Sequence, residues 1–213
     1  MLHPIRHETY RASLRRALSL ALLCLTASCA YEVTWLGSDP APYAAPNPPL
    51  GWTIAVGMQS FDARYVREVG VADRFVKELR GARLFQSVLY PIPAGVDPVW
   101  EMRLVVHETF VDPSSNFWKA VLNGIFPPAR FFVYAQEEYT LDIEALLTRR
   151  KEVIGTYSAK GPVRYRYQSY APEDKREAEG VDLILARTTG DIFRQIAADA
   201  ARLDAEDRAR AGR

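Results

Sequence analysis

The chain has 213 residues, of which 48% are hydrophobic and 25% charged, a composition typical of a globular protein with a substantial core. This composition excludes a chain that is disordered over most of its length. The formal net charge of +1 includes four Arg and one Glu within residues 1–28, so without that segment the charge would be −2. The rest of the chain therefore has no excess of basic residues for binding nucleic acid.

The first thirty residues have the features of an export signal. Arg6, Arg11, Arg15 and Arg16 precede an apolar run over residues 17–25. A run of about nine residues is far shorter than the roughly 20 that a membrane-spanning helix needs. The sequence therefore predicts a segment that directs export and is then removed.

Residues 25–29, Leu-Thr-Ala-Ser-Cys, resemble the cleavage motif of bacterial lipoproteins, with small residues at the two positions before Cys29. Cys24 follows two bulky leucines and fits this motif less well. The resemblance implies a signal peptide over 1–28 and a lipid-modified Cys29 (palmitate and related acyl chains) as the first mature residue. Cys24 would leave with the signal, so no disulfide could form within one chain. An ordinary secretory signal cut after Ala27 or Ala30 is the alternative.

The residue after the cysteine helps to decide the membrane in that family, where Asp commonly retains the protein in the inner membrane. Ala30 is not that signal, so the resemblance implies a lipid anchor in the outer membrane with the domain facing the periplasm. Two or three acyl chains, at about 0.8 kcal/mol per buried CH₂, would anchor the chain more firmly than any surface patch.

Residues 29–50 have the composition of a linker, with five prolines among Ala, Asn, Ser and Gly. Such a segment tends toward extended polyproline structure and is expected to hold the following domain away from the bilayer. In the alternative, residues 31–36, whose apolar side chains alternate, pair as an edge strand.

A strand, a helix and a second strand are predicted at the start of a single domain over 51–203. Apolar residues alternate over 52–59, which indicates a strand, and helix-capping residues at 60–62 precede a helix over 63–80 that stops at Gly81. Residues 84–90 are rich in strand-forming types.

Further elements follow in the second half of the domain. The patterns predict a strand over 99–107, a helix over 116–126, a long antiparallel hairpin over 131–167 and a helix over 181–203. The charged residues 204–213 are expected to fray as a tail. Together these elements predict an α+β fold, an α/β sandwich with a mixed, mainly antiparallel sheet of about five strands and two main helices on one face.

This order of elements resembles the α/β domain shared by three kinds of bacterial envelope protein. They are the curli-secretion lipoprotein, the outer-membrane activators of penicillin-binding proteins, and the amino-terminal domain of the Tol-system periplasmic protein. The residues that carry the resemblance are 54–56 (Ile-Ala-Val), 60–62 (Ser-Phe-Asp) and 84–88 (Leu-Phe-Gln-Ser-Val). The resemblance is one of fold and does not assign a function.

Few reactive side chains are available for catalysis. His107 is the only histidine after residue 7, no Gly-x-Ser-x-Gly motif is present, and no glycine-rich phosphate loop occurs. We therefore expect no catalytic residue, no metal site and no cofactor. A cell-wall hydrolase using Glu137 or Glu138 with Asp142 is a remote alternative, and a structural pair between Glu137 and a basic residue is favoured over it.

Two groups of residues are candidates for binding a partner. Arg and Tyr are enriched at protein interfaces, and they recur in one run near the end of the hairpin. The helix over 116–126 has an apolar face too broad for an ordinary surface helix, so it packs into its own domain, docks on a partner or lies against lipid. The candidates are Arg164, Tyr165, Arg166, Tyr167 and Tyr170 in the run, and Phe117, Trp118, Val121, Leu122 and Ile125 in the helix.

The predicted function is that of a non-enzymatic envelope lipoprotein that acts as a periplasmic protein-binding or assembly module. Its expected partners are the membrane, through the lipid on Cys29, and an envelope protein; an oligomer is possible. A subunit of an oligomeric envelope transport or secretion complex is the alternative.

Overall fold

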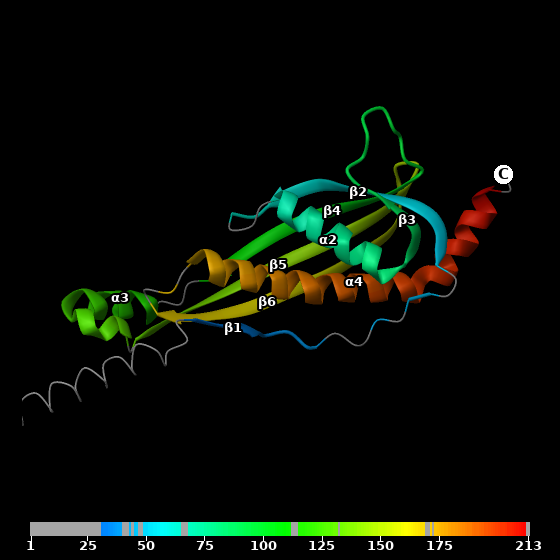
Figure 1. Ribbon diagram of the computed structural model, residues 1–213. Helices are drawn as coiled ribbons and strands as arrows, with labels where there is room; N and C mark the ends of the chain where they lie inside the picture. The colour runs from blue at the N-terminus through cyan, green and yellow to red at the C-terminus, as the bar shows by residue number, and fades with distance from the viewer. Residues whose placement is uncertain are drawn as a thin grey trace, which may run out of the picture.

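The computed structural model describes residues 31–39, 43, 45–46, 49–64, 68–111, 115–131, 133–168, 171 and 173–211. The signal segment and Cys29 lie outside the described residues. Figure 1 shows the elements along the chain. They are β1 (Tyr31–Trp35), β2 (Leu50–Asp62), α2 (Glu68–Ala82), β3 (Phe85–Leu89), β4 (Trp100–Val111), α3 (Ser115–Ile125), η1 (Pro127–Phe131), β5 (Tyr134–Arg149), β6 (Glu152–Gln168) and α4 (Glu173–Ala211).

The strands form one mixed sheet in the order β1-β6-β5-β4-β2-β3. β1, β6, β5 and β4 are antiparallel neighbours, whereas β2 runs parallel to both β4 and β3. The predicted long hairpin is present as β5 and β6. The sheet has six strands where about five were expected. The additional edge strand is β1, whose residues were predicted to belong to the linker.

The pairing of β1 changes the position of the proline-rich segment. Tyr31 pairs with Tyr167 and Trp35 with Val163, so the chain joins the sheet at Tyr31. The alternative prediction of an edge strand is the one that the structure shows. The prolines lie between β1 and β2, so they do not separate the domain from residue 29.

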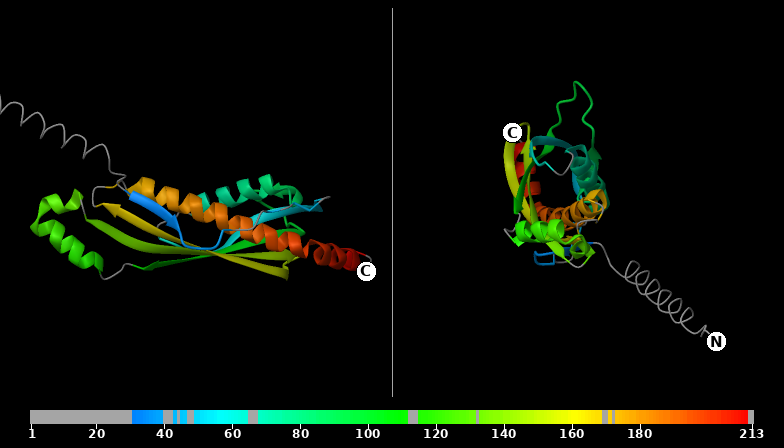
Figure 2. Two further views of the ribbon diagram at one scale, coloured as in Figure 1. Left: turned by 90° about the horizontal axis from the view of Figure 1, so that it is seen from below. Right: turned by 90° about the vertical axis from the view of Figure 1, so that its left-hand side faces the viewer.

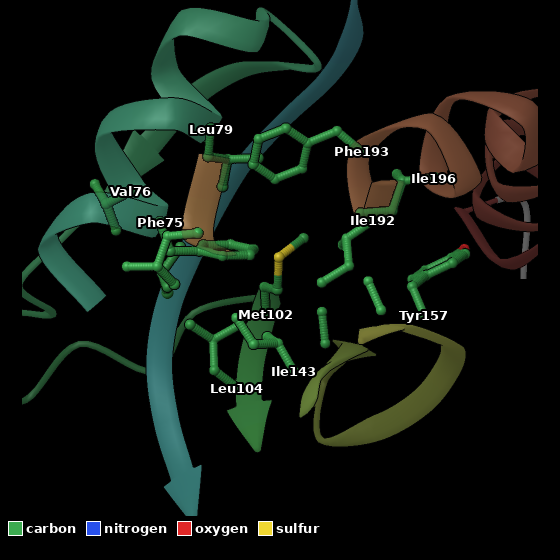
Figure 3. Close-up of a cluster of buried hydrophobic side chains, with 14 of the residues drawn as sticks. Phe75, Val76, Leu79, Met102, Leu104, Ile143, Tyr157, Ile192, Phe193 and Ile196 are labelled. Carbon is green, nitrogen blue, oxygen red and sulfur yellow. The ribbon is translucent and has the colours of Figure 1, made fainter. Parts of the chain in front are cut away.

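Both main helices, α2 and α4, lie on one face of the curled sheet (Figure 2). Their apolar side chains meet those of the central strands, where Phe75 and Ile192 are fully buried over Met102 (Figure 3). At one end of the sheet the rings of Trp52 and Trp100 stack 3.8 Å apart. Burying this single apolar face drives the folding of the domain.

The helix boundaries differ from those predicted. α2 begins at Glu68 and continues through Gly81 to Ala82, and the left-handed residue that follows is Arg83, with φ 52°. α4 begins at Glu173 and ends at Ala211, so the helix predicted over 181–203 is longer at both ends.

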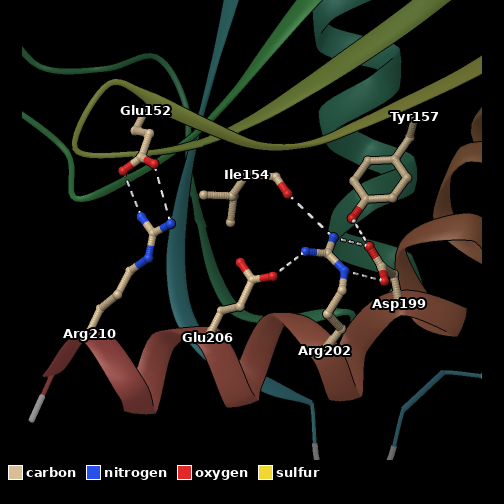
Figure 4. Close-up of polar contacts among 7 residues, drawn as sticks. All are labelled: Glu152, Ile154, Tyr157, Asp199, Arg202, Glu206 and Arg210. Carbon is tan, nitrogen blue, oxygen red and sulfur yellow. Dashed lines mark hydrogen bonds and ion pairs between the residues drawn. The ribbon is translucent and has the colours of Figure 1, made fainter.

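The expected charged tail, residues 204–213, is helical as far as Ala211 because side chains attach it to the β5–β6 hairpin. Arg149 Nε donates to Asp207 Oδ1 at 2.8 Å, and Arg210 Nη1 lies 2.7 Å from Glu152 Oε2. Earlier in the same helix, Arg202 contacts Asp199, Glu206 and the carbonyl of Ile154 (Figure 4). Local periodicity could not predict contacts between residues so far apart in the sequence.

Candidate functional site

Both predicted recognition elements lie at one end of the sheet. Tyr31 at the start of β1 pairs with Tyr167 near the end of β6, and Gln168 pairs with Tyr134 at the start of β5. α3 and η1 connect β4 to β5 at this end, and α4 begins there (Figure 1). We call this the α3 end, and the opposite end, with the β5–β6 turn, the hairpin end.

The predicted Arg/Tyr run does not form one surface, because successive residues of a strand point to opposite faces. Tyr165 and Tyr167 turn toward α4, where Tyr165 is 5% exposed. Arg164 is on the other face and forms an ion pair with Glu138, N to O 2.8 Å. Arg166 lies there too, 4.5 Å from the centre of the Tyr134 ring. Tyr170 lies outside the described residues.

The inward tyrosines belong to a pocket of about 220 Å³ between the sheet and the first turns of α4. It takes residues from three strands, one helix and Ala171 between β6 and α4, and Glu137, which interrupts the apolar face of β5, is the feature of the sequence that points to it. The lining consists of Phe110, Glu137, Tyr139, Tyr165, Tyr167, Ala171, Glu173, Arg176, Glu177 and Val181. Arg176 is not among the predicted site residues, because it precedes the helix predicted over 181–203.

Arg176 is the central charged group of this pocket and is only 6% exposed. Its guanidinium carbon lies 3.6 Å from the centre of the Tyr167 ring, a cation–π contact, and Nη2 lies 3.9 Å from Glu137 Oε2. Tyr167 Oη donates to the other oxygen of the same carboxylate. Within the described part of the chain, Arg176 Nε and the hydroxyl of Tyr139 have no hydrogen-bond partner.

Burial in the pocket opposes ionisation of three tyrosines and one glutamate. Burial raises the pKa of Tyr139, Tyr165 and Tyr167 far above the usual value for tyrosine, so these phenols stay protonated. Burial, followed by the nearby charge of Glu173, also raises the pKa of Glu177. Three carboxylates and one guanidinium leave the pocket acidic, with aromatic walls.

The carboxylates considered for hydrolysis are engaged in structural contacts. Glu137 contacts Tyr167 and Arg176, and Glu138, on the opposite face, pairs with Arg164. Asp142 Oδ2 lies 3.1 Å from Lys160 Nζ. The contacts of Glu137 match the expected structural pair, although its basic partner comes from α4 and not from a neighbouring strand.

His107 lies at the surface, with Nδ1 3.1 Å from Asp62 Oδ2. Among residues whose positions are described, no group of three or more His, Cys, Asp or Glu side chains is arranged to hold a metal ion. The same residues include no helix with the length and apolarity needed to cross a bilayer.

Besides the pocket, the α3 end carries α3 itself, and the apolar face of this helix is exposed. Trp118 is 70% and Ile125 78% exposed, and Phe117, Leu122 and Phe126 are also exposed, while Val121 is half-buried. Of the three predicted situations for this helix, packing into its own domain is the one that the structure contradicts. The helix follows β4 and precedes β5 in the chain, but it lies beyond the end of the sheet, where the core does not cover it (Figure 1).

Comparisons with known proteins give similarities to solved structures only. No family model and no curated protein matches the chain. A Xanthomonas campestris protein of the DUF330 family is 11% identical with a TM-score of 0.45, covering 76% of this chain and 95% of that one. A minor lipoprotein from Acinetobacter baumannii is 11% identical with a TM-score of 0.40, and the match covers 72% of this chain and 96% of that one.

A putative lipoprotein from Caulobacter crescentus is 14% identical with a TM-score of 0.34, over 70% of this chain and 90% of its own. Two of these three similar structures are bacterial lipoproteins, but similarity this weak carries no argument about function. The more specific resemblance to the curli-secretion, penicillin-binding-protein-activator and Tol group stays a prediction.

Proposed function

We propose that this chain is a non-catalytic lipoprotein of the bacterial outer membrane, anchored through Cys29, whose periplasmic domain binds another envelope protein. The observation that carries this proposal is the position of β1. The sheet begins at Tyr31, two residues after the lipidation motif, so a lipid on Cys29 would hold the α3 end of the domain at the bilayer surface.

The absence of catalysis is supported by the use of the reactive groups. Glu137, Glu138 and Asp142 each have a cationic partner, and Glu137 also accepts from Tyr167, as expected for structural pairs. Such pairs are common on protein surfaces and do not need a substrate to explain them.

The binding role is supported by the acidic pocket. Phe110 at its rim is exposed, and Tyr139 and Tyr165 supply aromatic surface, residue types that contribute strongly to protein interfaces. Arg176 Nε and the Tyr139 hydroxyl remain for hydrogen bonds with an incoming group. The excess of carboxylates favours a basic or amide side chain of the partner.

The test is photo-crosslinking in intact envelopes from a photoreactive phenylalanine analogue at Phe110. Val153 is the matched control position, because it is also exposed and lies at the hairpin end. We expect a discrete adduct with another protein from position 110 and not from 153. In the Cys29→Ala variant the chain should move to the soluble periplasmic fraction and the adduct should weaken severalfold.

Two results would contradict the proposal. Equal adducts from positions 110 and 153 would mean that the pocket is not the binding surface. If a Cys29→Ala protein that also carries Leu122→Asp and Ile125→Asp on the exposed face of α3 stays on the membrane at high salt, the lipid on Cys29 is not the anchor, because salt screens surface charge and the Asp substitutions remove the apolar contact.

A further inference from the structure

The exposed apolar residues of α3 form one continuous stripe. Trp118, Leu122 and Ile125 follow at i, i+4 and i+7, which places them on the same side of the helix. Their exposed fractions are 70%, 46% and 78%. Of the eleven exposed large hydrophobic residues in the part of the chain described, five fall within 117–126. Such a concentration marks a contact surface.

The helix is held in one orientation relative to the sheet. The Asn116 side chain donates to the carbonyl of Gln136 at 2.7 Å and accepts from the Gln136 amide at 3.1 Å. This pair of hydrogen bonds joins the first turn of α3 to the start of β5, and the other main contacts of the helix are with η1. The stripe is therefore a fixed feature of the α3 end.

The position of the stripe indicates what covers it. Cys29 is two residues before Tyr31, and two extended residues span about 7 Å, so acyl chains on Cys29 would enter the bilayer close to the start of β1. α3 projects from the same end of the sheet (Figures 1 and 2). Because the tether between the lipid and β1 is so short, the α3 end of the domain, and α3 with it, would lie at the membrane.

The charge of this segment suits a bilayer containing anionic lipid. Residues 115–131 contain Lys119 and Arg130 and no Asp or Glu, although acidic and basic residues are nearly balanced in the whole chain. At 11 residues α3 is about 16 Å long, too short to span a membrane and long enough to lie along its surface. Trp and Phe are the residue types favoured at the boundary between headgroups and acyl chains.

We propose that α3 lies in the membrane interface, with Trp118, Leu122 and Ile125 among the upper acyl chains, as a second contact that orients the lipid-anchored domain. This inference rests on the proposed anchoring through Cys29. A second contact beside the anchor removes the freedom of the domain to rotate about its tether, so the acidic pocket keeps a fixed direction relative to the bilayer.

The test uses the full lipidated protein, purified in detergent and reconstituted into vesicles of phosphatidylethanolamine and phosphatidylglycerol with brominated acyl chains, which quench nearby tryptophan. Trp118 is the exposed tryptophan, whereas Trp35 is half-buried and Trp52 and Trp100 are each 6% exposed in the core. The difference in emission between the native protein and Trp118→Phe reports on Trp118. We expect bromination near the headgroups to quench this difference by more than half.

A double variant, Leu122→Asp with Ile125→Asp, should lose this quenching while its far-ultraviolet circular dichroism and its flotation with vesicles stay unchanged. Flotation of the native protein without quenching of Trp118 would overturn the inference and leave the anchor intact. Shielding of Trp118 from aqueous acrylamide without bromine quenching would also overturn it, since a second copy would then cover α3. Failure of the native protein to float would count against the anchor itself.

Discussion

Gly180 and Gly161 show how single residues set the distance between α4 and β6. A Cβ at Gly180 would lie 1.9 Å from Tyr165 Oη, and one at Gly161 would lie 2.3 Å from Ile184 Cγ2. Both distances are far inside van der Waals contact, so the helix approaches the strand only because these side chains are absent. The close approach also places Arg176, one turn before Gly180, against the rings of Tyr165 and Tyr167.

We predict opposite effects for two glycine substitutions in α4. Gly180→Ala should destabilise the protein by about 1–3 kcal/mol, because the added methyl group would overlap the buried ring of Tyr165 and displace it. Gly190→Ala, in the same helix with nothing within 4 Å of the added Cβ, should stabilise it by about 0.5–1 kcal/mol. Urea unfolding measures both, and similar changes in the two variants would contradict the packing at Gly180.

At the scale of elements, α4 shows the limit of sequence periodicity. The apolar spacing that predicts a helix over 181–203 fades in the first and last turns, where charged residues predominate. The last turns are joined to the hairpin by the contacts of Arg149 with Asp207 and of Arg210 with Glu152, and Arg176 joins the first turns to Glu137 on β5. α3 is the reverse case, since its helical pattern was predicted correctly but the sequence left open whether its apolar face is buried in the domain.

Arg149 gives a test of how the last turns of α4 are held. Its side chain is 13% exposed, pairs with Asp207 and lies 5.6 Å from the centre of the Trp100 ring. Arg149→Met should reduce stability by about 1–2 kcal/mol and accelerate amide hydrogen exchange in residues 204–211. The control, Arg208→Met, removes an exposed ion pair with Asp204 and should change stability by less than about 0.5 kcal/mol. Equal effects would show that Arg149 does not hold the helix end.

At the scale of the whole molecule, the two ends of the sheet have different surfaces. The α3 end combines the start of β1, the apolar stripe and the acidic pocket, whereas the hairpin end carries the β5–β6 turn and the last turns of α4. If the α3 end is at the membrane, as proposed, the hairpin end extends into the periplasm and α4, about 58 Å long by its 39 residues, runs between them.

Energy transfer to an acceptor dye on lipid headgroups would measure this orientation. Val111 and Val153 are exposed to similar extents, 51% and 52%, and lie near opposite ends of the sheet. Their partners on β5, Glu138 and Thr148, are ten residues apart, about 33 Å along the strand. A donor on Val111→Cys should transfer several times more efficiently than one on Val153→Cys. Equal efficiencies would mean that the domain lies flat or rotates freely.

Much of the architecture was predictable from the sequence because it depends on local patterns. Apolar residues at a spacing of two or of three to four predict strands and helices directly, and the order of elements predicts a mixed α+β sheet. The motif ending at Cys29 also needs no fold to be seen, since it is read as a short linear sequence.

Tertiary structure alone decided which residues meet. The Arg/Tyr run is divided because a strand sends neighbours to opposite faces, and Arg176 reaches Glu137 because α4 crosses β6 at Gly180. The pairing of β1 with β6, which brings the proposed anchor beside α3, joins residues more than a hundred positions apart. Local sequence cannot specify such contacts, because they form only when the whole apolar face of the sheet is buried.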